Sequence, residues 1–141
     1  MLSDKADAFS EHLVAEAAPL DYARTQNNLG AAYTELPVGD RAANLRRAIA
    51  CFEQALRFRT PEAAPFDYAR TQNDLGNAYL RLPEGEGDRV ANLRQAIACY
   101  EQALRVFTPE ADPSEYATTQ TNLGTAYLQL PVGDRAANLQ Q

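Results

Sequence analysis

The sequence predicts an all-α fold, a solenoid of antiparallel helix pairs, and three observations lead to this prediction. A segment of 46 to 48 residues recurs along the 141-residue chain. Within each copy, apolar residues are spaced three and four positions apart, which places them on one face of a helix. Proline or aspartate stands where each helix is expected to begin. Repeated pairs of amphipathic helices bury their apolar faces by stacking on one another.

The repeat is visible in a ten-residue segment that begins at Asp21 and returns with few changes at Asp67 and at Glu115. Its two periods differ because the segment 83–88 is two residues longer than its counterpart in the first unit. Apart from those two residues, 34 of 46 positions match between the first two units. We therefore divide the chain into a leader (1–18), two full units (19–66 and 67–114) and a truncated third unit (115–141).

The first helix of each unit, helix A, is expected to begin at a proline and to end before another. Proline suits the first helical position, and an acidic residue two positions later complements the helix dipole. The residue before a proline avoids the helical region, which predicts the end of the helix. The starts are Pro19, Pro65 and Pro113, and the stops are Leu36, Leu82 and Leu130. One face of helix A in the first unit carries Tyr22, Gln26, Leu29, Tyr33 and Leu36.

The second helix, helix B, is expected to begin after Asp40, whose side chain suits the N-cap, and to run to about Phe58. Its apolar stripe is continuous at helical spacing and recurs in the second unit. In the first unit the stripe consists of Leu45, Ala48, Ile49, Phe52, Ala55 and Leu56.

These spacings resemble the tetratricopeptide repeat (TPR), which places Leu-Gly-x-x-Tyr in helix A and Ala-x3-Phe-x2-Ala in helix B. Here the matching residues are Leu29, Gly30 and Tyr33, followed by Ala48, Phe52 and Ala55. The resemblance implies a right-handed α-α superhelix. The chain departs from the family in its longer period, and in a glutamine at the usual tryptophan position. HEAT and armadillo repeats fit the period better but lack the Leu-Gly-x-x-Tyr signature.

The candidate binding residues lie on helix A, where the positions that differ between units fall on a polar arc of about 120°. We call this set the helix-A stripe. The resemblance implies that it lines a concave groove for a peptide or partner helix; the alternative is an unconstrained solvent-exposed face. The stripe consists of Arg24, Asn27, Asn28, Ala31, Thr34, Glu35, Arg70, Asn73, Asp74, Asn77, Leu80, Arg81, Thr118, Thr121, Asn122, Thr125, Leu128 and Gln129.

Composition disfavours several other functions. The net charge of −6 argues against nucleic-acid binding, and no apolar run approaches the length of a membrane span. Cys51, Cys99 and the single histidine, His12, are too few for a zinc site. The sequence contains no recognisable set of catalytic residues and no cofactor motif. We therefore expect that the protein is not an enzyme and binds no metal ion or cofactor. The equivalent cysteines of successive units are expected to be buried thiols in a reducing, cytoplasmic compartment.

Two further interpretations concern the 83–88 segment and the ends of the chain. The segment lacks the residues of a phosphate or calcium loop, which predicts a solvated turn. The third unit stops early in helix B, and residues 2–13 carry a short apolar stripe at helical spacing. Residues 1–18 and 123–141 therefore suggest self-association, head to tail or by exchange. The alternative is that the chain is a section of a longer array.

Overall fold

The computed structural model describes residues 15–133. Within this range five complete helices follow one another, with no strand between them: α2 (Pro19–Glu35), α3 (Arg41–Leu56), α4 (Pro65–Arg81), α5 (Arg89–Leu104) and α6 (Pro113–Gln129). The all-α prediction is confirmed for these residues. Most of the leader, including the apolar stripe of residues 2–13 and His12, lies outside the described residues. The expected second helix of the third unit also lies outside them.

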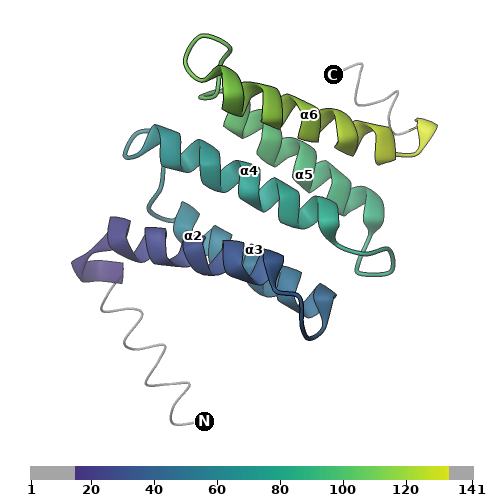
Figure 1. The fold of residues 1–141 in the computed structure, drawn as a ribbon, viewed down its shortest axis with the longest axis horizontal. Coiled ribbons are helices and arrows are strands. Elements are labelled where there is room, and N and C mark those ends of the chain that lie inside the picture. Colours follow the sequence, from purple (N-terminus) through teal and green to yellow (C-terminus); the bar gives the residue numbers. More distant parts are fainter. Residues whose placement is uncertain (1–14, 134–141) are drawn as a thin grey trace.

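The helices form two layers, which Figure 1 shows with α2, α4 and α6 toward the viewer and α3 and α5 behind. Each helix packs against the next along the chain, and α4 also contacts both α2 and α6. Helices A therefore lie side by side in one layer and helices B in the other. This stacking is compatible with a helical repeat.

The ends of the helices follow the local signals in the sequence. Pro19, Pro65 and Pro113 each occupy the first turn of their helix. The Asp40 carboxylate accepts a hydrogen bond from the backbone N–H of Ala43 at 3.2 Å, so the expected N-cap is confirmed. Helix α3 ends at Leu56, two residues before the expected end, because the N–H of Phe58 bonds the carbonyl of Ala55, three residues back, in a tighter turn.

Packing explains the glycine of the Leu-Gly-x-x-Tyr signature in the first two units. A Cβ atom on Gly30 would lie 2.6 Å from the ring of Phe52, and one on Gly76 would lie 2.7 Å from the ring of Tyr100. Both rings are buried, with exposed fractions of 1% and 0%. The glycine allows the aromatic residue of helix B to pack directly on the backbone of helix A.

Tyrosine hydroxyls form hydrogen bonds between helices at equivalent positions of successive units. Tyr68 donates to Gln102 of its own unit at 2.9 Å, as Tyr22 donates to Gln54 at 3.4 Å. A second tyrosine of helix A reaches helix B of the preceding unit. These bonds run from Tyr79 to Glu53 at 3.4 Å and from Tyr127 to Glu101 at 3.3 Å. The same contacts therefore recur with the period of the sequence.

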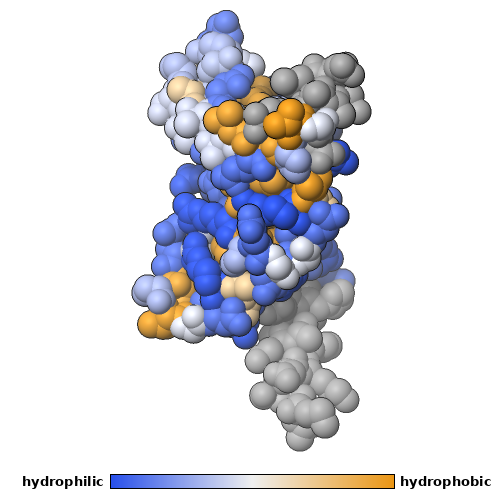
Figure 2. Space-filling model, turned by 90° about the vertical axis from the view of Figure 1, so that its right-hand side faces the viewer, coloured by the Kyte–Doolittle hydropathy of each residue, from blue (hydrophilic) through white to orange (hydrophobic). Residues whose placement is uncertain are grey.

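Burial of the repeated leucines depends on their place in the stack. Leu75 is 6% exposed because it packs into the cluster between α3, α4 and α5, whereas its counterpart Leu29 is 43% exposed. At the other end, Leu128 and Val132 are largely exposed. Figure 2 shows apolar side chains gathered toward the α6 end of one face and a smaller group at the opposite end, with a mostly hydrophilic surface between them.

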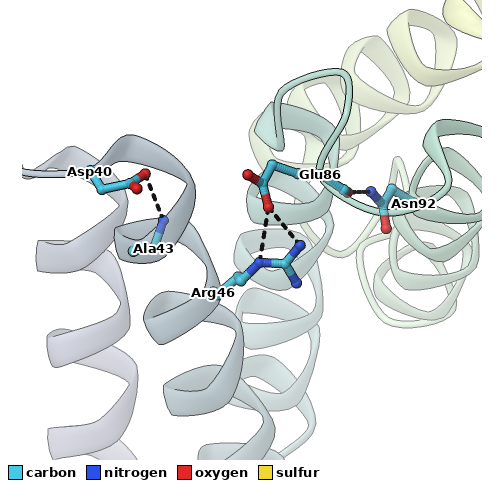
Figure 3. A network of polar contacts seen from close by, with 5 residues as sticks. All are labelled: Asp40, Ala43, Arg46, Glu86 and Asn92. Atoms are coloured by element: carbon cyan, nitrogen blue, oxygen red, sulfur yellow. Dashed lines mark hydrogen bonds and ion pairs between the residues drawn. The ribbon is translucent and has the colours of Figure 1, made fainter.

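The 83–88 segment forms a turn and also makes a contact between units (Figure 3). The Glu86 carboxylate accepts hydrogen bonds from Nη2 of Arg46 at 2.8 Å and from Nε at 3.3 Å. The Glu86 carbonyl accepts a hydrogen bond from Asn92. Gly85 and Gly87 have φ values of +92° and +77°, a region that favours glycine. The two additional residues therefore belong to a loop that contacts α3, which is helix B of the preceding unit.

Candidate functional site

The helix-A stripe does not form one uniform surface. Eleven members are exposed: Arg24, Asn28, Ala31, Glu35, Arg70, Arg81, Thr118, Thr121, Thr125, Leu128 and Gln129. Asp74, Asn77, Leu80 and Asn122 are half-buried. Asn27, Thr34 and Asn73 are buried, because they face a neighbouring helix or their own unit's interior. Ten of the eighteen residues line two recesses between α2 and α4, one toward each end of the helix pair.

The first recess, which we call the arginine recess, has a volume of about 270 Å³. Helix α2 contributes one arginine and two amides to it, and α4 contributes one arginine and one carboxylate. A third arginine comes from the α3–α4 connection. The lining residues are Arg24, Asn27, Asn28, Arg59, Asp67 and Arg70.

Arg59 is a member of this recess that the sequence interpretation missed, because only the helix-A positions were compared between units. The signal was present in the same alignment, in which Arg59 stands opposite Phe107. Phe107 is 1% exposed and packs edge-to-face on Phe66, with ring centroids 5.4 Å apart. Arg59 is 7% exposed. A charged side chain thus occupies a buried position that carries an aromatic residue in the next unit.

Hydrogen bonds connect the floor of the arginine recess across the two helices. The Thr71 hydroxyl donates to Oδ1 of Asn27 at 2.7 Å and accepts from Nη1 of Arg59 at 3.2 Å. Nδ2 of Asn27 donates to the Asp74 carboxylate at 3.5 Å. Burial raises the pKa of Asp74, against the opposing effects of the Asn27 hydrogen bond and of the charges on Arg70 and Arg59. Asn27 therefore acts as a bridge between units.

The second recess has a volume of about 90 Å³ and lies over the ring of Phe52. Arg81 donates to the Glu35 carboxylate at 2.8 Å across its mouth, and this hydrogen bond lowers the pKa of Glu35. Oδ1 of Asn77 accepts from the buried Tyr100 hydroxyl at 2.6 Å. Several of its polar groups are thus engaged with one another. The stripe residues that line it are Ala31, Thr34, Glu35, Asp74, Asn77 and Arg81.

The remaining stripe residues lie outside both recesses. Asn73 accepts a hydrogen bond from Thr119 of α6 at 3.2 Å, which repeats the Asn27–Thr71 bond one unit later. Leu80 packs into the apolar cluster between α4, α5 and α6. The hydroxyls of Thr121 and Thr125 donate to carbonyls of their own helix. The other α6 members are Thr118, Asn122, Leu128 and Gln129, of which Gln129 accepts a hydrogen bond from Arg89.

Among residues 15–133, no cluster of three histidine, cysteine or acidic side chains could hold a metal ion. Both cysteines are buried free thiols, and burial raises the pKa of Cys99 to about 12, which leaves the thiol protonated near neutral pH. Within the same residues, no helix has the length and apolar character needed to cross a membrane.

Comparisons with protein-family models, with curated proteins and with solved structures give no match to this chain.

Proposed function

We propose that this chain is a non-enzymatic interaction scaffold, a TPR-like right-handed superhelix that binds a peptide or a partner segment through its helix-A face. The observation that carries the proposal is the arginine recess. It opens between two helices A and presents charged and amide groups from α2, α4 and the α3–α4 connection. Amide side chains suit hydrogen bonding to a peptide backbone, and guanidinium groups suit acidic side chains.

Packing between units supports the same proposal. Inter-unit hydrogen bonds fix α4 against α2, and the Arg46–Glu86 ion pair holds the α4–α5 loop against α3. A recess whose walls are held by the core is preorganised, and preorganisation reduces the entropic cost of binding. The acidic composition and the mixed charges of the recess favour a protein partner over nucleic acid or a membrane.

Selection of binders from a displayed random-peptide library tests the proposal. We expect selected peptides to lose at least tenfold in affinity for the Arg70→Glu variant, since Arg70 lines the recess and is exposed. Arg105→Glu is the matched control, because Arg105 is an exposed arginine at the C-terminal end of α5, in the other layer. Equal affinity for the two variants would contradict the proposal, provided that circular dichroism shows both to be folded.

A second candidate is self-assembly through residues 1–18 and 123–141, which the exposed apolar side chains at the two ends of the stack favour. Leu29 of α2 is 43% exposed and Leu36, which follows α2, is 37% exposed, whereas their counterparts Leu75 and Leu82 are buried. At the α6 end, Leu128 is 71% exposed, whereas its counterpart Leu80 packs between α4, α5 and α6. These surfaces are at the positions where a preceding or following unit packs within the described stack.

Native mass spectrometry and sedimentation distinguish this candidate from the first. Self-assembly predicts a concentration-dependent oligomer that is lost on deletion of residues 1–18 or on Leu128→Asp. A monomer at high protein concentration would contradict it. The peptide-binding proposal is independent of that outcome, because its variants lie in the arginine recess.

A further inference from the structure

We propose that the arginine recess is a binding site for a phosphoryl group carried on a serine or threonine side chain of a partner peptide. The inference rests on the proposed function, since it names the chemical class of the partner. Three guanidinium groups, those of Arg24, Arg59 and Arg70, line the recess together with the carboxylate of Asp67. The three arginines come from three separate segments of the chain.

Burial of Arg59 is the observation that points to an anion. A guanidinium group has five N–H donors, and a buried charge is costly without a charged partner. Arg59 is 7% exposed, and the side-chain hydrogen bond that the described residues provide for it goes to the neutral hydroxyl of Thr71. An anion in the recess would supply the missing charge and acceptors. Phe107 shows that this position can be filled by an apolar side chain in the same fold.

Acidic residues near the recess compensate only part of this charge. Asp67 is in the wall, and Asp21 lies 3.6 Å from Arg24 in an exposed ion pair. Asp74 interacts electrostatically with both Arg59 and Arg70 but accepts its hydrogen bond from Asn27. Solvent screens the exposed Arg24–Asp21 ion pair, whereas the buried Arg59 guanidinium is screened much less.

The junction between α4 and α6 provides an internal comparison. At the positions equivalent to the arginine recess it carries one arginine, Arg70, together with two acidic residues and an aromatic residue. The three-arginine arrangement is therefore a property of the first junction and does not follow from the repeat itself. The equivalent residues are Arg70, Asn73, Asp74, Phe107, Glu115 and Thr118.

Geometry favours a phosphoryl group over a carboxylate. A phosphorylated side chain carries nearly two negative charges and three acceptor oxygens that point in different directions. A carboxylate carries one charge and accepts in a single plane, which suits one bidentate arginine. Arginines that line the recess from α2, α4 and the α3–α4 connection suit an acceptor whose oxygens point in several directions. The recess volume of about 270 Å³ leaves space for such a group.

Titration of the full chain with inorganic phosphate tests the inference, with the arginine Nε–Hε signals followed by NMR at neutral pH. We expect saturable shifts for Arg24, Arg59 and Arg70 with phosphate, and none with acetate at the same ionic strength. In Arg59→Phe, which introduces the residue found at position 107, phosphate affinity should fall roughly 10- to 100-fold. Arg105→Gln, at an exposed position at the C-terminal end of α5, should leave phosphate affinity unchanged. Saturable binding of acetate equal to that of phosphate would overturn the inference, as would undiminished phosphate binding by Arg59→Phe.

A second measurement separates this inference from the proposed function. Degenerate peptide pools with a central phosphoserine, serine or glutamate are compared for binding to the wild-type chain and to Arg59→Phe. Preference for phosphoserine that disappears in Arg59→Phe supports the inference. Equal binding of all three pools, with sensitivity to Arg70→Glu, would overturn the phosphoryl site and leave the scaffold proposal standing. Thermal denaturation of Arg59→Phe establishes that the variant is folded.

Discussion

The Thr71 hydroxyl donates a 2.7 Å hydrogen bond to Oδ1 of Asn27 and thereby joins the helices A of two successive units. Both residues are buried, at 0% and 6% exposure. Thr119 makes the same bond to Asn73 one unit later, at 3.2 Å. The equivalent position of the third unit holds Thr121. In the first two units, the asparagine at this position forms a buried polar contact with the next helix A, which we call the inter-unit seam.

Removal of the Thr71 hydroxyl should destabilise the stack. Thr71→Val keeps the shape of the side chain but leaves buried polar atoms of Asn27 and Arg59 without this partner. We expect a loss of about 1–3 kcal/mol in the free energy of unfolding, measured by urea denaturation. Thr25→Val is the matched control, because Thr25 is exposed and donates to a carbonyl of its own helix. An equal loss in both variants would argue against the inter-unit seam.

The glycines of the repeat should respond differently to the same substitution. Gly76→Ala places a methyl group 2.7 Å from the Tyr100 ring, and overpacking of this kind costs about 1–3 kcal/mol. Gly124, at the equivalent position of α6, has no described atom within 4 Å of such a Cβ. Gly124→Ala should therefore raise the free energy of unfolding by up to about 1 kcal/mol, the difference in helix propensity. Thermal denaturation compares the two, and a Gly76→Ala variant as stable as Gly124→Ala would refute the packing explanation.

Repeated leucines should also differ in their contribution to stability. Leu75 is 6% exposed between α3, α4 and α5, so Leu75→Ala should cost about 2–5 kcal/mol. Leu29 is 43% exposed, and Leu29→Ala should cost less than about 1 kcal/mol. Chemical denaturation of the two variants measures the difference. Similar losses would mean that Leu29 is covered in solution, as the self-assembly candidate requires.

The elements predicted from the sequence were those with local causes. Pro19 begins a helix because its ring suits the first turn, and Asp40 caps one because its carboxylate reaches the N–H of Ala43. The partners across units were not predictable in this way. Asn27 and Asn28 are neighbours on the polar arc, yet the first is buried and the second exposed, because only the first faces Thr71. Arg59 was not predicted as a site residue because it lies in the α3–α4 connection and not on helix A. Its difference from Phe107 is nevertheless visible when the units are aligned.

Asp74 should make stability depend on pH. Burial raises its pKa above the ordinary value of 3.8, and this effect outweighs the Asn27 hydrogen bond and the charges of Arg70 and Arg59. The folded chain therefore holds this proton to a higher pH than the unfolded chain does. As the pH rises from 3.8 through the folded pKa, ionisation of Asp74 lowers the free energy of unfolding, and above that range the loss is constant. Asn28 and Asn122 show that an amide is accommodated at this position.

Asp74→Asn should consequently be more stable than the wild-type chain at neutral pH, with a gain that shrinks as the pH falls toward 3.8. Urea denaturation at a series of pH values measures the gain. Asn28→Asp is the matched control, because its side chain is exposed and its charge should change stability little. A less stable Asp74→Asn at neutral pH would show that attraction between Asp74 and the buried Arg59 exceeds the cost of burying the carboxylate. In that case Asp74, and not an external anion, would be the main partner of the Arg59 charge.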